Sequence, residues 1–521
     1  MDNLKEGFKL FFDLVRIPVI VFFLYVVYYI CNRLFLHPYL FRRKYKKYPN
    51  VYVDPEYKLM MGEIDTYLKN QSQNKVFYCH RKEVAQIINK YDLSVSLEGI
   101  YTGLKVVSPQ AMKEFFDLQP GKIDRQPETR GIGQVVPRGL MNIRATADFK
   151  EKRKQYLSLL SLNSSSKYLP YMLKTCDGMF QKIPENKYFE CNIVLNCLTF
   201  SIFSSIVFGE DVQEYLSDPE VRYDYITETR ETVQLSFREF FIKTVQSYIV
   251  QYYDIYGTIL PFLNTYRIIE PFKTNQKNVT KLYQILEDIC QRSSDPKSIL
   301  KQCENLYDDL VMLMVAGTDT SSHVLCSLIY FLEKFQIKDK LREELKTKGL
   351  DKGIKLEDIT SDKVQEVDYL NYVIKETMRM DSPTIDSFGY QAYEDINICG
   401  VPISKGTLVR PDFTSAHFSP DEWHSPMDFI PERFDPESEY FYKPSQDGKK
   451  EARSPYSWLT FSAGMRKCPG QSLAMLEIKI LITYLIVNFD YEVDKDLIEN
   501  DYVGFGLGSH FKLRMKLMKR V

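Results

Sequence analysis

Hydrophobic residues form one long and almost continuous run near the start of the chain. From Ile17 to Leu36 nearly every residue is apolar, and the exceptions are Pro18, Asn32 and Arg33. A helix of ~20 residues, rising ~1.5 Å per residue, just crosses the ~30 Å hydrocarbon core of a bilayer. The pattern therefore predicts one membrane-spanning helix at the N-terminus.

Further along the chain, the apolar residues recur with helical spacing. The longest such segment, from Glu304 to Phe335, is apolar nearly all round in its middle, which predicts a helix through the core. The segment from Gln471 to Ile486 has the same character. Short strand-like pieces occur at Asn397–Cys399, Thr407–Val409 and Phe511–Leu517. We therefore predict a mainly α body with a minor β-sheet region.

The domain organisation follows from the anchor and from the absence of internal repeats, low-complexity tracts and Gly/Ser linkers. We assign residues 1–36 to a membrane anchor, 37–50 to a basic juxtamembrane linker and 51–521 to one continuous domain. Charges before the anchor cancel, whereas Arg42, Arg43, Lys44, Lys46 and Lys47 follow it. The positive-inside rule then places the body in the cytosol. A cleaved signal peptide is the alternative, but the run is long for one and no small-residue cleavage site follows.

Overall composition indicates a globular protein. Apolar residues make up 44% and charged residues 26% of the chain, and the net charge of -1 gives no bias toward nucleic acid. The 10 cysteines are scattered without a C-x-x-C pair, which favours a reducing compartment. The sequons at Asn70, Asn163 and Asn278 offer a topology test, because a cytosolic body leaves them unglycosylated.

One cysteine lies in a loop suited to holding a metal. Gly464 can adopt a positive φ and Gly470 lets the backbone approach closely, so amide N–H groups can converge on the sulfur of Cys468. Arg466 can pair with a carboxylate of the same cofactor, and Phe461 precedes the loop. The following helix favours a thiolate through its positive N-terminal end. A single thiolate favours haem iron over zinc; a buried structural cysteine is the alternative.

The predicted central helix contains the run Ala316-Gly-Thr-Asp-Thr-Ser321. Gly317 removes a side chain where something bulky approaches, and the hydroxyl of Thr320 can leave the helix ladder or bend the helix. Burial of Asp319 is costly without a polar purpose. A kinked helix with a satisfied threonine is the structural alternative.

A third constellation combines an acidic and two basic residues. Glu376 and Arg379 share one helix face, and Arg433 follows in the run Pro431-Glu-Arg-Phe434. The E-x-x-R pattern alone is common on surface helices. Together the three residues can form a buried bidentate network.

These motifs resemble those of the cytochrome P450 monooxygenases, of the eukaryotic microsomal type. Phe461, Gly464, Arg466, Cys468 and Gly470 fill the haem-binding pattern Phe-x-x-Gly-x-Arg-x-Cys-x-Gly. The resemblance implies the cytochrome P450 fold and haem b with Cys468 as axial thiolate and metal ligand. It implies that Thr320 hydrogen-bonds dioxygen and that Asp319 helps to relay protons to it from solvent, with Gly317 beside the cofactor. Glu376, Arg379 and Arg433 match the structural triad of the family.

Two departures from the family pattern concern haem retention. Where the family commonly has Trp-x-x-x-Arg, this chain has Phe149 to Arg153, so Arg153 keeps the charge but the indole hydrogen bond is lost. The segment Asp381 to Asp395 lacks the Arg or His that the family usually supplies to a propionate. We expect Tyr390 or Gln391 to substitute, and somewhat easier haem loss.

The resemblance also implies partners and a location. Electrons would come from NADPH-cytochrome P450 reductase, docked on a face that includes Lys467, with cytochrome b5 as a second donor. The protein would be a single-pass protein of the endoplasmic reticulum membrane with a cytosolic catalytic domain and a lipophilic substrate. Entry is predicted along 248–263, and substrate contacts within 102–142 and 382–388. The alternatives are an O2-independent isomerase or dehydratase, a haem-based sensor or carrier, and a scaffold without haem.

Overall fold

The computed structural model describes residues 18–55, 85–98, 101–126, 132–227, 229–252, 272–302, 307–384, 387, 389–445, 448–499 and 513–520. Its α-helices are α2 (His37–Tyr45), α5 (Pro109–Asp117), α6 (Ile132–Val135), α7 (Ala147–Leu159), α8 (Leu162–Ser166), α9 (Leu169–Phe180), α10 (Cys191–Phe208), α11 (Glu210–Ser217), α12 (Phe237–Tyr252), α15 (Phe272–Arg292), α16 (Ile299–Gln302), α17 (Tyr307–Lys334), α18 (Lys338–Thr347), α19 (Ser361–Gln365), α20 (Asp368–Met380), α21 (Phe413–His417), α22 (Gln471–Asn488) and α23 (Lys495–Glu499). Short 3₁₀ turns cover Leu356–Asp358, Pro431–Phe434, Glu439–Phe441 and Gly464–Arg466.

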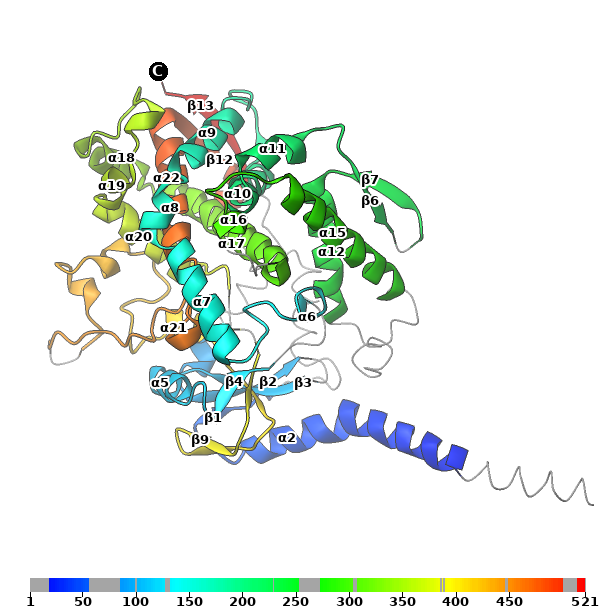
Figure 1. Ribbon diagram of the computed structural model, residues 1–521. Coiled ribbons are helices and arrows are strands. Elements are labelled where there is room, and N and C mark those ends of the chain that lie inside the picture. The colour runs from blue at the N-terminus through cyan, green and yellow to red at the C-terminus, as the bar shows by residue number, and fades with distance from the viewer. Residues whose placement is uncertain are drawn as a thin grey trace, which may run out of the picture.

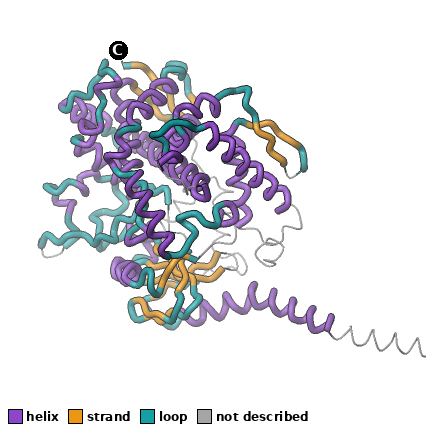
Figure 2. The backbone as a smooth tube through the Cα atoms, in the orientation of Figure 1, coloured by secondary structure: helices purple, strands orange, loops and turns teal. Residues whose placement is uncertain are grey.

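The strands form a small part of the molecule, as predicted. They are β1 (Val51–Tyr52), β2 (Leu93–Glu98), β3 (Tyr101–Val106), β4 (Ile123–Arg125), β5 (Phe189–Glu190), β6 (Tyr223–Ile226), β7 (Thr232–Leu235), β8 (Tyr390–Ala392), β9 (Ile396–Ile398), β10 (Val401–Ile403), β11 (Leu408–Pro411), β12 (Phe489–Val493) and β13 (Arg514–Lys519). The largest sheet has the order β1-β2-β3-β11-β8-β4, and β12, β13 and β5 form another. Figure 2 shows most strands gathered at the end of the body nearest the protruding N-terminal helix.

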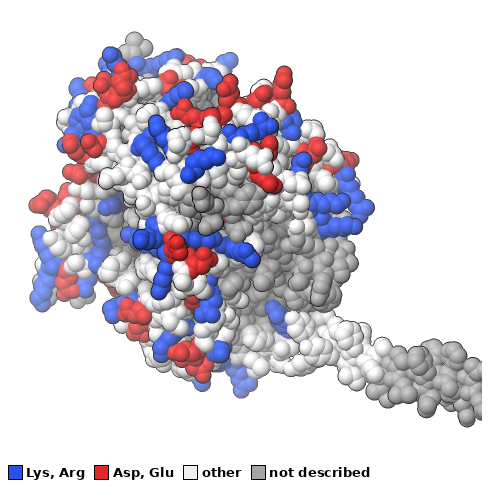
Figure 3. All heavy atoms as spheres, viewed as in Figure 1, with Lys and Arg blue, Asp and Glu red and all other residues white. Residues whose placement is uncertain are grey.

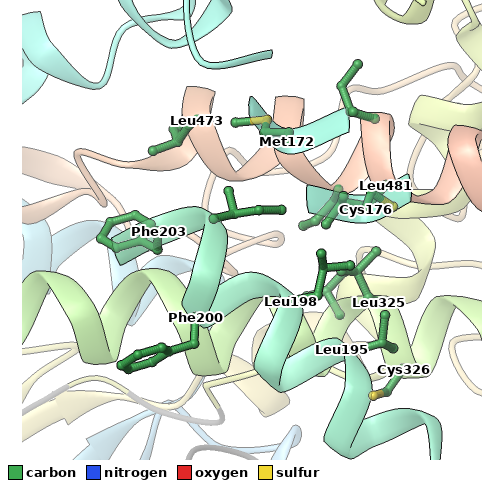
Figure 4. Packing of buried hydrophobic residues seen from close by; sticks show 14 of the residues in the cluster. Met172, Cys176, Leu195, Leu198, Phe200, Phe203, Leu325, Cys326, Leu473 and Leu481 are labelled. Carbon is green, nitrogen blue, oxygen red and sulfur yellow. The ribbon is translucent and has the colours of Figure 1, made fainter. Parts of the chain in front are cut away.

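Long apolar helices build the core. α10 and α22 are apolar nearly all round and are each long enough to cross a membrane, but 78% and 72% of their residues are buried inside the protein. A helix that is hydrophobic on every face and covered by neighbours belongs to the core. Figure 4 shows how Leu473 of α22, Met172 of α9 and Leu198 of α10 pack there. α17 passes through the middle of this assembly (Figure 1) and confirms the predicted central helix.

The N-terminal helix differs from these core helices because its surface is open. The helix from Pro18 to Tyr45 has a mean hydropathy of 2.0 over its most apolar window, of which 6% is buried. The described part of the protruding segment is almost free of charged side chains in Figure 3. These features fit the predicted membrane anchor.

The helix does not end at the predicted boundary of residue 36. It continues through a π-helical turn, Asn32–Leu36, into α2. Tyr45, at the end of α2, is fully buried, Lys44 Nζ lies 2.9 Å from Ser404 Oγ, and Asn50 donates to the carbonyl of Cys399 at 2.9 Å. Much of the segment assigned as a linker is therefore helical and fixed to the body.

Candidate functional site

The loop around Cys468 is held in a tight turn. The N–H of Cys468 donates to the carbonyl of Phe461 at 2.8 Å, which closes the loop. Gly464 has a φ of +64°, and a Cβ there would lie 3.3 Å from Phe116 Cδ1. Only glycine adopts this conformation without a steric penalty. The loop ends where α22 begins at Gln471, so Cys468 lies just ahead of the N-terminus of a buried helix.

Several groups act on the thiol of Cys468. Burial raises its pKa, whereas the amide N–H groups of Gly470 and Gln471 and the charges of Arg153 and Lys467 lower it. These amides and cations stabilise the thiolate form that binds metal. The side chain of Cys468 nevertheless keeps exposed surface. Protein atoms therefore surround the sulfur of Cys468 on most sides, and one side remains open.

The run from Ala316 to Thr320 lies in the middle of α17. Ala316 is exposed although its helix crosses the core, so open space borders this turn of α17. The hydroxyl of Thr320 donates to the carbonyl of Ala316 at 2.6 Å, within the helix. Asp319 Oδ1 accepts a hydrogen bond of 2.9 Å from the amide of Asn196, on α10. Both predicted catalytic residues therefore belong to the central helix, and Asp319 is tied to a neighbouring helix.

The group that approaches Gly317 is an aromatic side chain. A Cβ at Gly317 would lie 2.2 Å from Cε2 of Phe203, which projects from α10. Glycine is therefore required here for helix packing. The predicted role of Gly317 in cofactor binding gains no support from this contact.

Glu376, Arg379 and Arg433 form the buried network that their spacing predicts. Glu376 accepts from Arg379 Nε and Nη2, both at 2.8 Å, and from Arg433 Nε at 3.1 Å. All three side chains are fully buried. The remaining guanidinium N–H groups donate to backbone carbonyls, including those of Pro426 and Asp428. Every charge is thus satisfied inside the protein, which is typical of a structural network.

A histidine connects this triad to the cysteine loop. Arg379 Nη1 donates to the carbonyl of His417 at 2.8 Å, and His417 Nε2 accepts from the N–H of Leu459 at 2.9 Å. Burial, together with the charge of Arg379, lowers the pKa of His417 to about 3, so the ring stays neutral and can accept this bond. The triad thereby fixes the chain just before the loop that presents Cys468.

Arg466 has a protein carboxylate as its partner. Its guanidinium donates to Asp124 Oδ1 at 2.7 Å and to the carbonyl of Ile143 at 2.9 Å, and both charged side chains are buried. Arg144 Nε lies 3.5 Å from the other carboxylate oxygen of Asp124. Asp124 lies in the edge strand β4, and no sequence pattern predicted its position in the site.

Two aromatic residues lie where the sequence departs from the family pattern, and each makes a cation–π contact with an arginine. The guanidinium of Arg466 lies 4.3 Å from the ring centre of Phe149, within cation–π range. The guanidinium of Arg125 lies 4.5 Å from the ring of Tyr390, one of the two residues expected to substitute as a haem contact. Gln391, the other candidate, donates to the carbonyl of Gly406 at 3.1 Å.

These residues fit haem, which the motifs imply. Arg153 is half-buried in α7, and its pKa is lowered by burial and by the nearby charge of Arg466, although Cys468 opposes the shift. Among the described residues, no carboxylate pairs with Arg153. A cation in this position favours an anionic group, such as a haem propionate. An open thiol, an exposed turn of α17 and a half-buried cation together suit a flat, acidic, iron-containing cofactor.

Comparison with known proteins supports the same conclusion. The family model described as Cytochrome P450 matches residues 33–511. The chain is 28% identical over 223 residues to Cytochrome P450 3A31 of Mesocricetus auratus, which covers 43% of this chain and 41% of that protein. It is 28% identical over 314 residues to (1S)-1-hydroxy-luvungin A synthase CYP88A37 of Citrus sinensis, covering 58% of each protein. The chain thus spans about half the length of these curated relatives.

A longer match and a solved structure extend the comparison. Cytochrome P450 3A2 of Rattus norvegicus is 24% identical over 382 residues, 69% of this chain and 72% of that protein. The structure of retinoic acid bound cyanobacterial CYP120A1 superposes with a TM-score of 0.64 at 19% identity, covering 82% of this chain and 92% of that one. The family model and the solved structure each match most of the chain. The family model identifies the same family as the motif in the cysteine loop, and the solved structure shares the fold. The chain therefore belongs to the cytochrome P450 family.

Proposed function

We propose that this protein is a haem-dependent monooxygenase that inserts one atom of O2 into a lipophilic substrate. One observation carries the proposal: the loop of Cys468 occurs together with an acid and an alcohol, Asp319 and Thr320, beside the exposed turn of α17. The overall reaction consumes a C–H bond, O2, two electrons and two protons, and it yields an alcohol and water. An isomerase or dehydratase of the same fold needs no such proton supply.

Each residue has a role that follows from its surroundings. Haem b, when bound, would supply O2 binding and O–O cleavage, which a thiolate ligand favours. Cys468 would be the sulfur ligand; burial raises its pKa, and the amides of Gly470 and Gln471 favour the thiolate against that effect. Arg153 offers its charge to a cofactor carboxylate. Asp319 would accept and release protons, and the hydroxyl of Thr320, which donates to the carbonyl of Ala316 in the structure, would be the hydrogen-bond donor during the reaction.

The electron donor that we propose is NADPH-cytochrome P450 reductase, with cytochrome b5 as a second donor. The support is the N-terminal helix, which would keep the protein on the same membrane as an anchored reductase. Lys467, next to the cysteine, remains our candidate for the docking face.

We place the protein in the endoplasmic reticulum membrane with its body in the cytosol. Glycosylation tests this topology, but the three sequons differ in value. Asn278 is 1% exposed, and its amide both donates to and accepts from the backbone of Ile226, so it cannot take a glycan in the folded protein. Asn163 is exposed on α8 and is informative, whereas Asn70 lies outside the described residues. A glycan on Asn163 would reverse the proposed topology.

A lipophilic substrate is the class that the anchor favours, because an apolar compound concentrates in the bilayer beside the protein. Cyanobacterial CYP120A1, which shares the fold, was solved with retinoic acid bound. The predicted entry stretch lies on α12 up to Tyr252, and its remainder, 253–263, lies outside the described residues.

Spectroscopy of the full-length protein tests the proposal. The reduced protein should give a thiolate-type carbon monoxide spectrum, and Cys468→Ala should abolish it. Cys197→Ala, which removes a free cysteine from α10, is the matched control and should leave the spectrum unchanged. NADPH, reductase and O2 should then yield an oxygenated product. Product formation that needs neither O2 nor reductase would instead identify an isomerase or dehydratase.

A further inference from the structure

The segment of α17 that carries Asp319 is fixed by one face of α10. Asn196, Thr199 and Phe203 follow one another at helical spacing and so share that face. Phe203 fills the space at Gly317, and the hydroxyl of Thr199 lies 3.1 Å from the carbonyl of Thr318, to which it donates. Asn196 donates to Asp319. Three successive residues of α17 are therefore each contacted from α10, whose aromatic residues appear in Figure 4.

Asn196 lies between a cation and an anion. Its Nδ2 donates to Asp319 Oδ1 at 2.9 Å and has a longer contact of 3.4 Å to Ser322 Oγ. Its Oδ1 accepts from the guanidinium of Arg238, at the start of α12. A guanidinium only donates and a carboxylate only accepts, so the amide has one orientation that satisfies both neighbours. An asparagine is the side chain that can bridge the two groups in this way.

This bridge has a mechanical consequence for Asp319. Asn196 is 4% exposed, so water competes poorly for its bonds. The carboxylate of Asp319 is held toward α10, and Asn196 is itself held by a residue of α12. The last turn of α12 forms the start of the stretch predicted to admit substrate, so a shift of α12 would alter the hold on Asp319.

We propose that Asn196 is a positioning residue for proton delivery, and that Arg238 couples its orientation to the position of α12. The proposal rests on the proposed function, in which Asp319 handles protons during O2 reduction. Asn196 touches neither cofactor nor substrate in this scheme. Its contribution is to set where the carboxylate of Asp319 points.

The sharpest test is Asn196→Asp, which preserves the shape of the side chain and its acceptor for Arg238. The new carboxylate cannot donate to Asp319 and repels it. Asn192→Asp is the matched control, because Asn192 lies one turn earlier on α10 and is 8% exposed. Arg238→Met is a second variant that leaves Asn196 in place and removes the cation behind it. The carbon monoxide spectrum of each variant reports whether the site is intact.

The readout is the fate of O2 with NADPH, reductase and retinoic acid as an apolar probe. Reduction of O2 to water uses four electrons and four protons, whereas release as peroxide uses two of each. A misplaced Asp319 should raise peroxide released per NADPH, enlarge the solvent deuterium isotope effect and slow O2 consumption, by up to ~100-fold for a shift of ~1 Å. Asn196→Asp should show these changes, Arg238→Met smaller ones, and Asn192→Asp none.

A double variant separates the role of Asp319 from that of Asn196. In an Asp319→Asn background, Asn196→Asp should cause no further change, because the carboxylate that it orients is gone. If Asp319→Asn alone has no effect, the role assigned to Asp319 is wrong. If Asp319→Asn has the effect but Asn196→Asp behaves like the Asn192→Asp control, the positioning role of Asn196 is overturned.

Discussion

Glu477 provides a measurable link between the structure and pH. It lies on α22, nine residues beyond Cys468 in the chain, and its Oε2 accepts a 2.6 Å hydrogen bond from Ser321 of α17. Its other oxygen has no partner among the described residues. Burial raises the pKa of Glu477 from 4.5 to about 8, against the opposing effect of Ser321. The folded protein therefore keeps this carboxyl protonated near neutral pH.

The sign of the effect follows from linkage. The raised pKa means that Glu477 contributes stability fully below pH 4.5, and that this contribution is lost as the pH rises through about 8. Between these values the unfolded chain releases the proton while the folded protein keeps it. At pH ~7.5 the unfolding free energy is therefore lower by ~4 kcal/mol than it is below the unfolded-state pKa. This figure follows from ~3 pH units at ~1.4 kcal/mol each.

The window from pH 6.5 to 8 isolates Glu477 from its neighbours. The pKa of His417 falls from 6.5 to about 3, so the stability that it contributes is present above pH 6.5 and is lost only as the pH falls. Burial, with the charge of Lys375, lowers the pKa of Lys479 from 10.5 to about 8, so its opposing effect, which raises stability with pH, begins at the upper edge of this window and grows above it. Within the window we expect the unfolding free energy of the wild type to fall by ~2 kcal/mol.

The variant Glu477→Gln should remove this slope, because its amide stays neutral and its oxygen can still accept from Ser321. The gain over wild type should approach ~4 kcal/mol near pH 8 and shrink toward acid pH. Denaturant unfolding followed by the fluorescence of the 2 tryptophans, Trp423 and Trp458, measures it. The control Glu343→Gln, on the exposed face of α18, should leave the slope unchanged. A flat wild-type profile from pH 6.5 to 8 would show that Glu477 is ionised in the folded protein and would contradict the assignment of a buried neutral carboxyl.

Three further variants test the packing and charge of the site. Glu376→Ala leaves two guanidiniums buried without their carboxylate, and we expect a loss of ~3 to 5 kcal/mol of unfolding free energy, together with loss of haem. Gly317→Ala should displace Phe203 and destabilise the α10–α17 contact, and Phe203→Ala in the same chain should restore part of the loss in thermal stability. Asp124→Asn should weaken the hold on Arg466, so haem should transfer faster to an apoglobin acceptor; an unchanged transfer rate would count against the ion pair as a support of the cofactor site.

The sequence alone predicted the elements whose residues are close together in the chain. The cysteine loop, the E-x-x-R turn and the central helix are each local patterns, and the structure has them where the spacing indicated. Helical periodicity shows which face of a helix is apolar, but it does not show which residue of another helix meets that face. The partner of Gly317 was therefore missed. The same limit applies to Asp319, whose partner Asn196 lies on a different helix.

The partner of Arg466 was missed for a related reason. Asp124 and Arg466 are 342 positions apart and meet only because β4 lies at the edge of the largest sheet. A signal was present, since an acidic and a basic residue adjoin in a short strand at Asp124 and Arg125, but such pairs are common on surfaces. The replacement at Phe149 was visible in the sequence. Its cation–π contact with Arg466 was not, because that contact depends on how the loop of Cys468 meets α7.

The two groups of arginines around the site show how closed and open charge networks differ. Arg379 and Arg433 satisfy their donors on one glutamate and on backbone carbonyls, which leaves no capacity for a ligand. In the cluster of Arg144, Arg153 and Arg466, the single carboxylate of Asp124 serves Arg144 and Arg466 and leaves Arg153 without an acidic partner among the described residues. A network in which every guanidinium has a protein partner stabilises the fold. A network with an unpaired guanidinium can instead bind an anionic ligand. Removing a member of the first should destabilise the fold, and Arg153→Ala should release haem while the stability of the fold is unchanged.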